Sequence, residues 1–305
     1  MNATIYSENI EAIMEISTKV REILPKETVI SAITSTYKNN IGNYGVNKLY
    51  LVGKLGSVEE VINIVLEVVK ENNSKLILFE SNKNNREVAA RIAAKMNAGY
   101  IADCIDFNID VDGKIVAKRM VYASKAIETI KVLSELIIMT IPRKIVEPKA
   151  SWNIQCEVKH KEVKPAEVEK VVIDVKKKEL SAVPLESAEV IVSIGRGVKR
   201  KEDCKIIEEL ASILGGVVSC SRPIAADLKW FNEWIGLSGY KVSPKLYIAI
   251  GISGAIQHLA GIQNSKVIVA INKDLEAPII KSADYGVVVD LYEFIPKLIE
   301  KLKTK

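Results

Sequence analysis

Tyr247-Ile-Ala-Ile-Gly-Ile-Ser-Gly-Ala-Ile-Gln-His258 opens the stretch, Tyr247 to Leu291, that decides the fold of this chain. Its first residues, 247–251, form a short apolar run between Pro244 and Gly251, which predicts a buried strand. Two further apolar runs, 267–271 and 286–289, each end in polar residues. Strands that all finish this way place their last residues along one edge of a parallel sheet. Open α/β sheets hold nucleotides at that edge.

The turn after the first of these strands has the composition of an anion-binding loop. Ser253, Gly254 and Ala255 are small enough for the backbone to come close to a ligand. The segment 251–258 then turns into a helix, and free N–H groups at a helix start favour an anion. Asn272 and Asp290 close the other two strands, so the sequence predicts a cofactor site along this edge.

The same stretch resembles the C-terminal domain of the alpha subunit of electron transfer flavoprotein. The resemblance is carried by LYIAIGISGAIQHLAGIQNSKVIVAINKD (residues 246–274) and by APIIKSADYGVVVDL (residues 277–291), and it covers the last third of the chain almost without gaps. It implies a bound FAD that shuttles single electrons. It also implies a partner, the electron transfer flavoprotein beta subunit, which covers the flavin.

Three side chains are implied by the resemblance to tune the flavin. Arg222 should lie against the ring, Ser238 should bond flavin N5, and His258 should face the C2 carbonyl and support negative charge there. Arginine suits its position because it stays charged and presents a flat face. An ion pair at about 4 Å and an effective dielectric of about 20 is worth about 4 kcal/mol before desolvation. Arg222 could therefore shift the potential on the order of 100 mV, whereas a neutral hydrogen bond of about 1 kcal/mol supplies only tens of millivolts.

The other implied cofactor contacts run along the same edge of the sheet. Residues 253–257 should line the path of the ribityl and pyrophosphate groups through backbone N–H donors, and the strand ends at 272 and 290–291 should hold the adenosine part. The full implied set is Arg196, Ser221, Arg222, Ile235, Gly236, Leu237, Ser238, Ser253, Gly254, Ala255, Ile256, Gln257, His258, Asn272, Asp290 and Leu291.

The chain departs from the family pattern at three positions near these residues. Ile194 stands where the family usually has glycine, Leu237 where it has glutamine, and Tyr240 where it has lysine. The polar surroundings of flavin N5 are therefore expected to differ from the family norm. Trp230 and Trp234 lie in a segment that fits the family poorly, and we assign them to packing or to a subunit boundary.

Composition limits the class of protein. The chain has 305 residues, of which 48% are hydrophobic and 27% charged, so two globular domains with full cores are expected. Its net charge of +5 is modest and dispersed, which argues against nucleic acid. No apolar run approaches roughly 18 residues, so no membrane insertion is expected. The first residues of the chain include acidic side chains and no basic region. We therefore expect no signal peptide and a cytoplasmic chain.

Cysteine and histidine usage gives no metal site. Four cysteines are scattered without C-x-x-C spacing, and there are only two histidines. We therefore expect the four cysteines to be reduced, buried thiols. His160, in a charged and loosely patterned stretch, is assigned to the surface.

The first part of the chain alternates strands and helices. Apolar runs at 29–33, 48–52, 75–79 and 136–141 read as strands, and segments 57–69 and about 85–96 read as helices, with Ser57 as an N-cap. The alternation favours a βαβ domain with a mainly parallel sheet. Asp112-Gly113 predicts a two-residue hairpin turn. We expect this domain, residues 1–185, to act as a scaffold and partner contact, and 168–175 to be an edge strand before the connection.

The second domain, residues 186–305, is expected to be a doubly wound parallel-sheet FAD-binding domain. Strands are predicted at 189–193 and 216–221, with a helix at about 201–214 between them. Gly195-Arg196-Gly197 lacks the third glycine of a dinucleotide fingerprint, so it is no indication of NAD. The fold class is therefore α/β with two domains.

The resemblance implies that the chain carries electrons. No nucleophile or general acid–base pair is visible in the sequence, so we do not expect bond-making catalysis on a substrate. The alpha subunit would pass electrons from dehydrogenases to a quinone oxidoreductase, as in fatty acid β-oxidation. One alternative is the alpha subunit of an electron-bifurcating complex that oxidises NADH. Another, of a different class, is a nucleotide-binding interaction module without redox work.

Overall fold

The computed structural model describes residues 1–122, 126–163, 166, 184–185 and 187–304. The chain divides into two compact units, Met1–Val175 and Lys176–Lys305. The domain boundary that we expected after residue 185 therefore lies C-terminal to the boundary between these two units. The strand expected at 168–175 lies outside the described residues.

The first unit is built on a seven-stranded sheet in which every pairing is parallel, in the order β10-β3-β2-β1-β4-β9-β5. This confirms the mainly parallel sheet, and the four apolar runs expected as strands are β2, β3, β4 and β9. The strands are β1 (Asn2–Tyr6), β2 (Ile30–Thr34), β3 (Lys48–Val52), β4 (Ser74–Glu80), β5 (Gly99–Ile101), β9 (Ile137–Ile141) and β10 (Glu157–Lys161).

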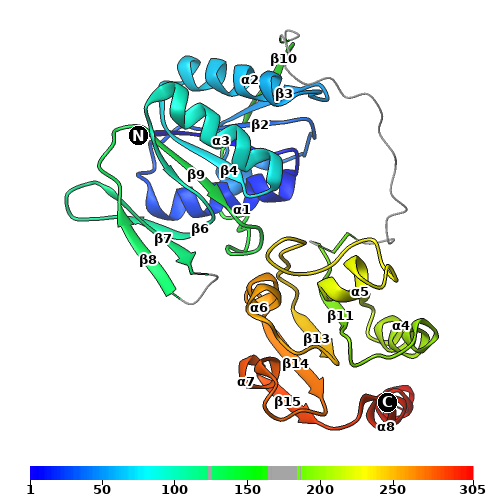
Figure 1. Cartoon of the computed structure of the whole chain (residues 1–305). Helices are drawn as coiled ribbons and strands as arrows, with labels where there is room; N and C mark the ends of the chain where they lie inside the picture. The colour runs from blue at the N-terminus through cyan, green and yellow to red at the C-terminus, as the bar shows by residue number, and fades with distance from the viewer. Residues whose placement is uncertain (123–125, 164–165, 167–183, 186, 305) are drawn as a thin grey trace. The chain divides into compact units, whose positions relative to one another are not determined.

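Helices cover both faces of this sheet (Figure 1). On one face, α1 (Ile10–Ile23) packs Ile13, Ile16 and Val20 into the core. On the other lie α2 (Val58–Glu71) and α3 (Lys83–Met96). A short 3₁₀ turn, η1 (Ile41–Tyr44), lies between β2 and β3. The predicted cap of α2 is confirmed, because the Glu60 backbone N–H donates to Ser57 Oγ at 3.2 Å.

A three-stranded antiparallel sheet, β6-β7-β8, is attached to the first unit. Its strands are β6 (Cys104–Ile109), β7 (Ile115–Val121) and β8 (Ala126–Lys131). The predicted hairpin between β6 and β7 is confirmed, but the prediction that its turn has two residues is wrong. Asp110 and Lys114 form the closing pair, so the loop spans 111–113, with Gly113 at φ +73°. The glycine takes the left-handed position that a three-residue hairpin loop needs.

The second unit has a five-stranded parallel sheet in the order β12-β11-β13-β14-β15. The chain runs from β11 to one side and then returns to the other, so the direction of winding switches between β11 and β13. The strands are β11 (Val190–Ile194), β12 (Val217–Cys220), β13 (Leu246–Ile250), β14 (Val267–Asn272) and β15 (Tyr285–Val288).

Helices again cover both faces, which confirms the doubly wound fold (Figure 1). One core contains side chains of α4 (Cys204–Ile213), α5 (Arg222–Ala226) and α8 (Leu291–Lys303). The other contains those of α6 (Ile256–Ile262) and α7 (Pro278–Ser282). The helix expected at 201–214 is α4, preceded by the 3₁₀ turn η2 (Lys201–Asp203). With both faces covered, the carboxyl edge of the sheet is left for a ligand.

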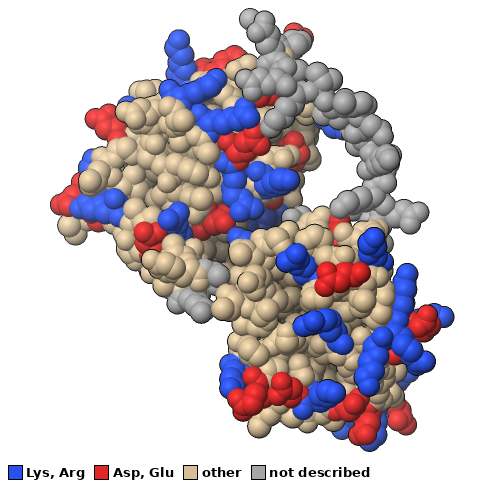
Figure 2. All heavy atoms as spheres, viewed as in Figure 1, with Lys and Arg blue, Asp and Glu red and all other residues tan. Residues whose placement is uncertain are grey.

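Charges of both signs are interspersed over the face of the molecule seen in Figure 2. Many of them form ion pairs on the surface, such as Lys161 with Glu67 and Arg91 with Glu59. None of the helices in the described part of the chain has both the length and the apolar character that a membrane crossing requires.

Candidate functional site

The two glycine-containing loops at the switch point of the second sheet interlock. A Cβ on Gly195 would lie 2.2 Å from the carbonyl oxygen of Gly251, and a Cβ on Gly197 would lie 2.6 Å from the Gly251 Cα. The loops are also bonded, since the Gly197 N–H donates to the Gly251 carbonyl at 2.9 Å. Only glycine permits this approach, so these residues fix the floor of the carboxyl edge. Arg196 lies between them with its side chain exposed.

The loop that follows β13 leaves a run of backbone donors unused. Gly254 has φ +83°, and a Cβ there would lie 2.3 Å from the Ile279 backbone nitrogen of α7. The consecutive N–H groups of residues 253–257 have no hydrogen-bond acceptor among the residues that the structure describes. Ser253, Ala255, Ile256 and Gln257 are exposed. A run of free N–H groups in a glycine turn suits the negative charge of a phosphate.

The segment 234–240 connects this loop with the end of β12. Its Ile235 N–H donates to the Cys220 carbonyl at 3.0 Å, and its Leu237 N–H donates to the Gln257 carbonyl at 2.7 Å. A Cβ on Gly261 would lie 2.6 Å from the Gly236 nitrogen, so α6 packs directly on this segment. The structure therefore brings together three groups of predicted residues, which are 221–222, 235–238 and 253–258.

Arg222 and Ser221 lie where β12 gives way to α5. Ser221 is buried and its N–H donates to the Ile194 carbonyl at 2.9 Å. Arg222 is the first residue of α5, followed by Pro223, and its side chain is exposed. It makes no ion pair or side-chain hydrogen bond with the described residues. An arginine with no such partner at this edge is available to an anionic ligand.

Ser238 is held by a residue that the sequence did not place at the site. The Trp234 indole Nε1 donates to Ser238 Oγ at 3.4 Å. The Trp234 carbonyl accepts from the Tyr240 N–H at 2.9 Å, and a Cβ on Gly239 would lie 2.2 Å from that carbonyl. Trp234 therefore shapes the turn that presents Ser238. The only sequence signal was its position four residues before Ser238.

His258 points into the protein. Its side chain is 6% exposed, Nε2 lies 2.9 Å from the Tyr247 hydroxyl, and Nδ1 lies 3.1 Å from the Ile235 carbonyl. Burial lowers the pKa of His258 to about 4. Both ring nitrogens are thus used by the chain itself, a feature that sequence reasoning missed.

Asn272 and Asp290 organise the strand ends at the far side of the edge. Asn272 Nδ2 donates to the Ile252 carbonyl at 2.7 Å, and its Oδ1 accepts from the Asp274 N–H at 3.0 Å. Asp290 caps α8 by accepting from the Tyr292 N–H at 2.8 Å, and Leu291 is buried. Asn272 therefore ties the loop after β13 to the loop after β14.

The positions that depart from the family pattern have distinct settings. Ile194 is fully buried at the end of β11. Leu237 is 51% exposed and Ile256 is 44% exposed, so two apolar side chains border the free N–H groups. The Tyr240 hydroxyl donates to Glu233 Oε1 at 2.9 Å. The edge is thus partly apolar beside its polar donors, as a site for a flat aromatic ring requires.

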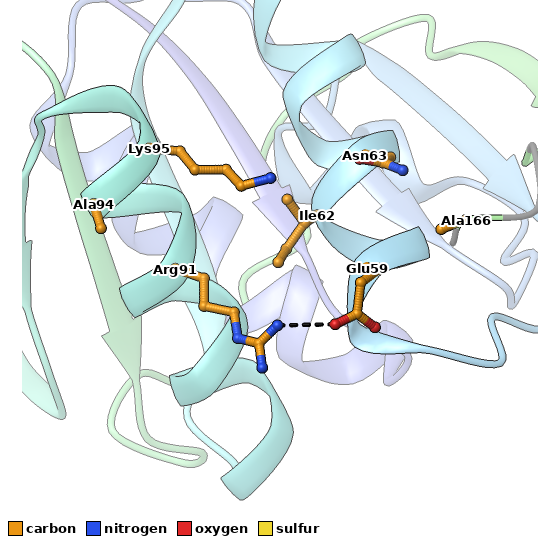
Figure 3. A pocket seen from close by; sticks show the side chains of 7 residues that line it. All are labelled: Glu59, Ile62, Asn63, Arg91, Ala94, Lys95 and Ala166. Carbon is orange, nitrogen blue, oxygen red and sulfur yellow. Dashed lines mark hydrogen bonds and ion pairs between the residues drawn. The ribbon is translucent and has the colours of Figure 1, made fainter. Parts of the chain in front are cut away.

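A hollow of about 520 Å³ lies elsewhere, on the α2 and α3 side of the first unit. Arg91 and Glu59, which both line this hollow, form an ion pair with Nη1 and Oε1 2.9 Å apart (Figure 3). The lining residues are Glu59, Ile62, Asn63, Arg91, Ala94, Lys95 and Ala166, and none belongs to the predicted site. In the described part of the chain, no three His, Cys, Asp or Glu side chains are grouped to hold a metal ion.

The fold and the edge described above define a cofactor-binding α/β protein with its site at a topological switch point. Residues 184–263 match the family model of the electron transfer flavoprotein FAD-binding domain, and residues 22–176 match that of the electron transfer flavoprotein domain. The chain belongs to the electron transfer flavoprotein alpha-subunit family, and its second unit is the FAD-binding domain of that family.

Curated relatives cover most of the chain. It is 38% identical to the electron transfer flavoprotein subunit alpha of Bacillus subtilis, over 86% of this chain and 82% of the relative. It is 38% identical to the subunit alpha of Thermoanaerobacterium thermosaccharolyticum, over 81% and 76%. It is 32% identical to subunit LctC of the lactate dehydrogenase (NAD(+),ferredoxin) of Acetobacterium woodii, over 98% and 76%.

Proposed function

We propose that this chain is the alpha subunit of a heterodimeric electron transfer flavoprotein, in which FAD lies at the carboxyl edge of the second sheet. The beta subunit covers the flavin, dehydrogenases donate electrons, and a quinone oxidoreductase accepts them. The observation that carries the proposal is the run of free N–H groups at 253–257 close to the segment that bears Ser238.

The residues present fit FAD in three respects. The free N–H groups provide donors for a pyrophosphate, and the glycines at 251 and 254 let it approach the backbone. The exposed apolar side chains of Leu237 and Ile256 provide a surface for the ring. Asn272, Asp290 and Leu291 lie at the strand ends assigned to the adenosine part, where Asp290 retains a second carboxylate oxygen for a hydroxyl.

Bound FAD supplies one-electron chemistry, and the chain's own residues set how readily the ring accepts charge. Arg222 is the tuning cation, because its guanidinium presents a flat face and has no partner among the described residues. Ser238, positioned by Trp234, offers a hydroxyl to flavin N5. Arg196 and Ser221 complete the rim of the edge.

Co-expression of the chain with its beta partner tests the proposal. The purified complex should show flavin absorbance, and acid release should yield FAD. Arg222→Ala should weaken FAD retention, whereas Arg91→Ala should leave it unchanged, because Arg91 is paired with Glu59 and Glu87 in the other unit. A colourless complex would contradict the proposal.

A second candidate is the alpha subunit of an electron-bifurcating complex that oxidises NADH. It is favoured by the coverage of 98% of this chain in the match to subunit LctC, whose complex is named for both NAD(+) and ferredoxin. Flavin counting separates the candidates, because a second flavin in the dimer together with NADH oxidation would favour bifurcation.

The remaining alternative is a nucleotide-binding interaction module without redox work. The free N–H groups at 253–257 would bind AMP or ADP as well as FAD. They alone therefore do not distinguish this module from an electron carrier. Arg222 discriminates, since a cation beside the ring matters for accepting electrons. AMP or ADP released from a colourless complex would favour the module.

A further inference from the structure

Tyr292, in the first turn of α8, connects two parts of the carboxyl edge that are far apart in the sequence. Its hydroxyl oxygen accepts a hydrogen bond from the Lys199 backbone N–H at 3.0 Å, and the hydroxyl donates to Asp203 Oδ2 at 2.8 Å. A backbone N–H can only donate and a carboxylate can only accept, so the hydroxyl acts once as acceptor and once as donor. These two bonds, the Tyr292 link, join the start of α8 to the loop that follows β11.

The Tyr292 link joins elements on the two sides of the strand ends assigned to the cofactor. In the order of the sheet, β13 and β14 lie between β11 and β15. β13 leads into the loop 251–255, and β14 ends at Asn272. Because α8 follows β15 and the 195–203 loop follows β11, the strand ends assigned to the pyrophosphate and to the adenosine part lie between the two elements that Tyr292 joins.

The loop that Tyr292 holds is the one that bears Arg196. Its first half is fixed by the loop after β13, since the Gly197 N–H donates to the Gly251 carbonyl at 2.9 Å. Its second half is the segment 199–203. In the described part of the chain, the two bonds of the Tyr292 link are the only hydrogen bonds that join this segment to an element outside the loop and α4. The second half of the loop therefore depends on Tyr292 for its position.

The protonation states of both side chains suit the link. Arg200 Nη2 lies 2.9 Å from Asp203 Oδ1, and the Asp203 side chain is only 12% exposed. The hydrogen bonds from Arg200 and Tyr292 lower the pKa of Asp203, so its carboxylate is ionised at neutral pH and accepts from the tyrosine. Burial raises the pKa of Tyr292, so the hydroxyl keeps the hydrogen that it donates.

A second contact joins the same two helices at a distance from the carboxyl edge. Lys303 Nζ, at the end of α8, lies 2.6 Å from Glu209 Oε1 of α4. A helix of this length places its last residue about 18 Å from its first, so this ion pair is remote from Tyr292. Apolar side chains of α4 and α8 also share the core on this face of the sheet. The packing of α4 against α8 therefore has support besides Tyr292.

We propose that Tyr292 is a positioning residue for the adenosine diphosphate part of a dinucleotide cofactor. Its hydroxyl holds the segment 199–203 against the start of α8, and thereby keeps the loop that bears Arg196 in place at the edge. The identity of the cofactor as FAD rests on the proposed function, whereas the link itself does not. Because the link acts at the adenosine end, its loss weakens the binding of oxidised and reduced FAD equally and leaves the flavin potential unchanged.

The test compares the purified heterodimeric complex of wild type with two variants. Tyr292→Phe removes only the hydroxyl, and Lys303→Met, the matched control, removes the other polar contact between α4 and α8. After dilution, Tyr292→Phe should release FAD roughly fivefold faster than wild type, the effect of one hydrogen bond, and Lys303→Met should release it at the wild-type rate. Peptides covering 198–203 should exchange hydrogen faster in Tyr292→Phe alone, and the midpoint potential should be the same in all three complexes.

Four results would overturn the proposal. They are an unchanged release rate in Tyr292→Phe, an equal acceleration in Lys303→Met, unchanged hydrogen exchange at 198–203 in Tyr292→Phe, and a shifted midpoint potential in that variant. A colourless wild-type complex that releases AMP or ADP, and does so faster in Tyr292→Phe, would refute the proposed function and support this inference. A wild-type complex that holds no nucleotide of any kind would overturn both.

Discussion

Gly197 and Gly251 lie backbone to backbone at the switch point of the second sheet. A Cβ on Gly197 would lie 2.6 Å from the Gly251 Cα, and a Cβ on Gly251 would lie 2.7 Å from the Gly197 Cα. Each loop therefore occupies the space that a side chain on the other would need. The loop after β13 owes its position, and the direction of its free N–H groups, to this contact.

Gly251→Ala should destabilise the second unit and reduce FAD retention. Gly251 has φ +62°, so alanine adds backbone strain of about 1–2 kcal/mol as well as the overlap with Gly197, which adds about 1–3 kcal/mol. Urea unfolding measures the loss of free energy.

Gly215→Ala is the matched control, because Gly215 has nearly the same φ, +64°, with no atom within 4 Å of an added Cβ. It should show the strain without the overlap. Equal losses in the two variants would mean that the contact between the loops contributes nothing.

Arg222→Ala should lower the flavin midpoint potential on the order of 100 mV, because a nearby cation stabilises negative charge on the reduced ring. Arg222→Lys keeps the charge but not the flat face, so its shift should be smaller. Spectroelectrochemical titration of the complex gives both values. An unchanged potential in the alanine variant would remove the charge argument.

His258 should make the second unit less stable in mild acid. The pKa of His258 is lowered to about 4 from an ordinary 6.5, so the unfolded chain takes up a proton that the folded chain refuses. The stabilisation is complete above pH 6.5 and is lost as the pH falls toward 4. His258→Gln should flatten this part of the profile of unfolding free energy against pH, and a slope that persists in the variant would assign it to another group.

Glu71 should contribute a separate acid transition in the first unit. A hydrogen bond from Tyr50, with Lys161 and Lys159, lowers the pKa of Glu71 from 4.5 to about 2. Its contribution is present above pH 4.5 and is lost as the pH falls toward 2. The stability difference between wild type and Glu71→Gln should narrow over that interval. A stability difference that stays constant over that interval would contradict this assignment.

The local pattern of apolar and polar residues was sufficient to predict much of the secondary structure of the second unit. Short apolar runs between glycine or proline and polar residues gave β11, β12, β13, β14 and β15, and the small residues at 253–255 indicated the loop. In the first unit the same reasoning missed β1 and α1. β1 contains Asn2 and Thr4, whose polarity hides a central strand because Thr4 Oγ1 is paired with Ser74 Oγ at 2.8 Å.

Long-range partners explain the other omissions. α1 buries Glu15 and Arg21, which break its apolar stripe, and Arg21 is satisfied by backbone carbonyls such as that of Thr28 at 2.8 Å. The inward direction of His258 depends on Tyr247 and Ile235, eleven and twenty-three positions away in the sequence. The role of Trp234 depends on the geometry of the turn between residues 234 and 240, and its spacing of four residues from Ser238 was too weak a signal to predict it.

Hydrogen exchange of the complex with and without FAD tests the central claim most directly, because it reports on the backbone amides themselves. Peptides covering 251–258 should exchange more slowly when FAD is bound, and peptides covering 53–57, after β3 of the first unit, should not change. Unaltered exchange at 251–258 on loading with FAD would contradict the placement of the cofactor at this edge.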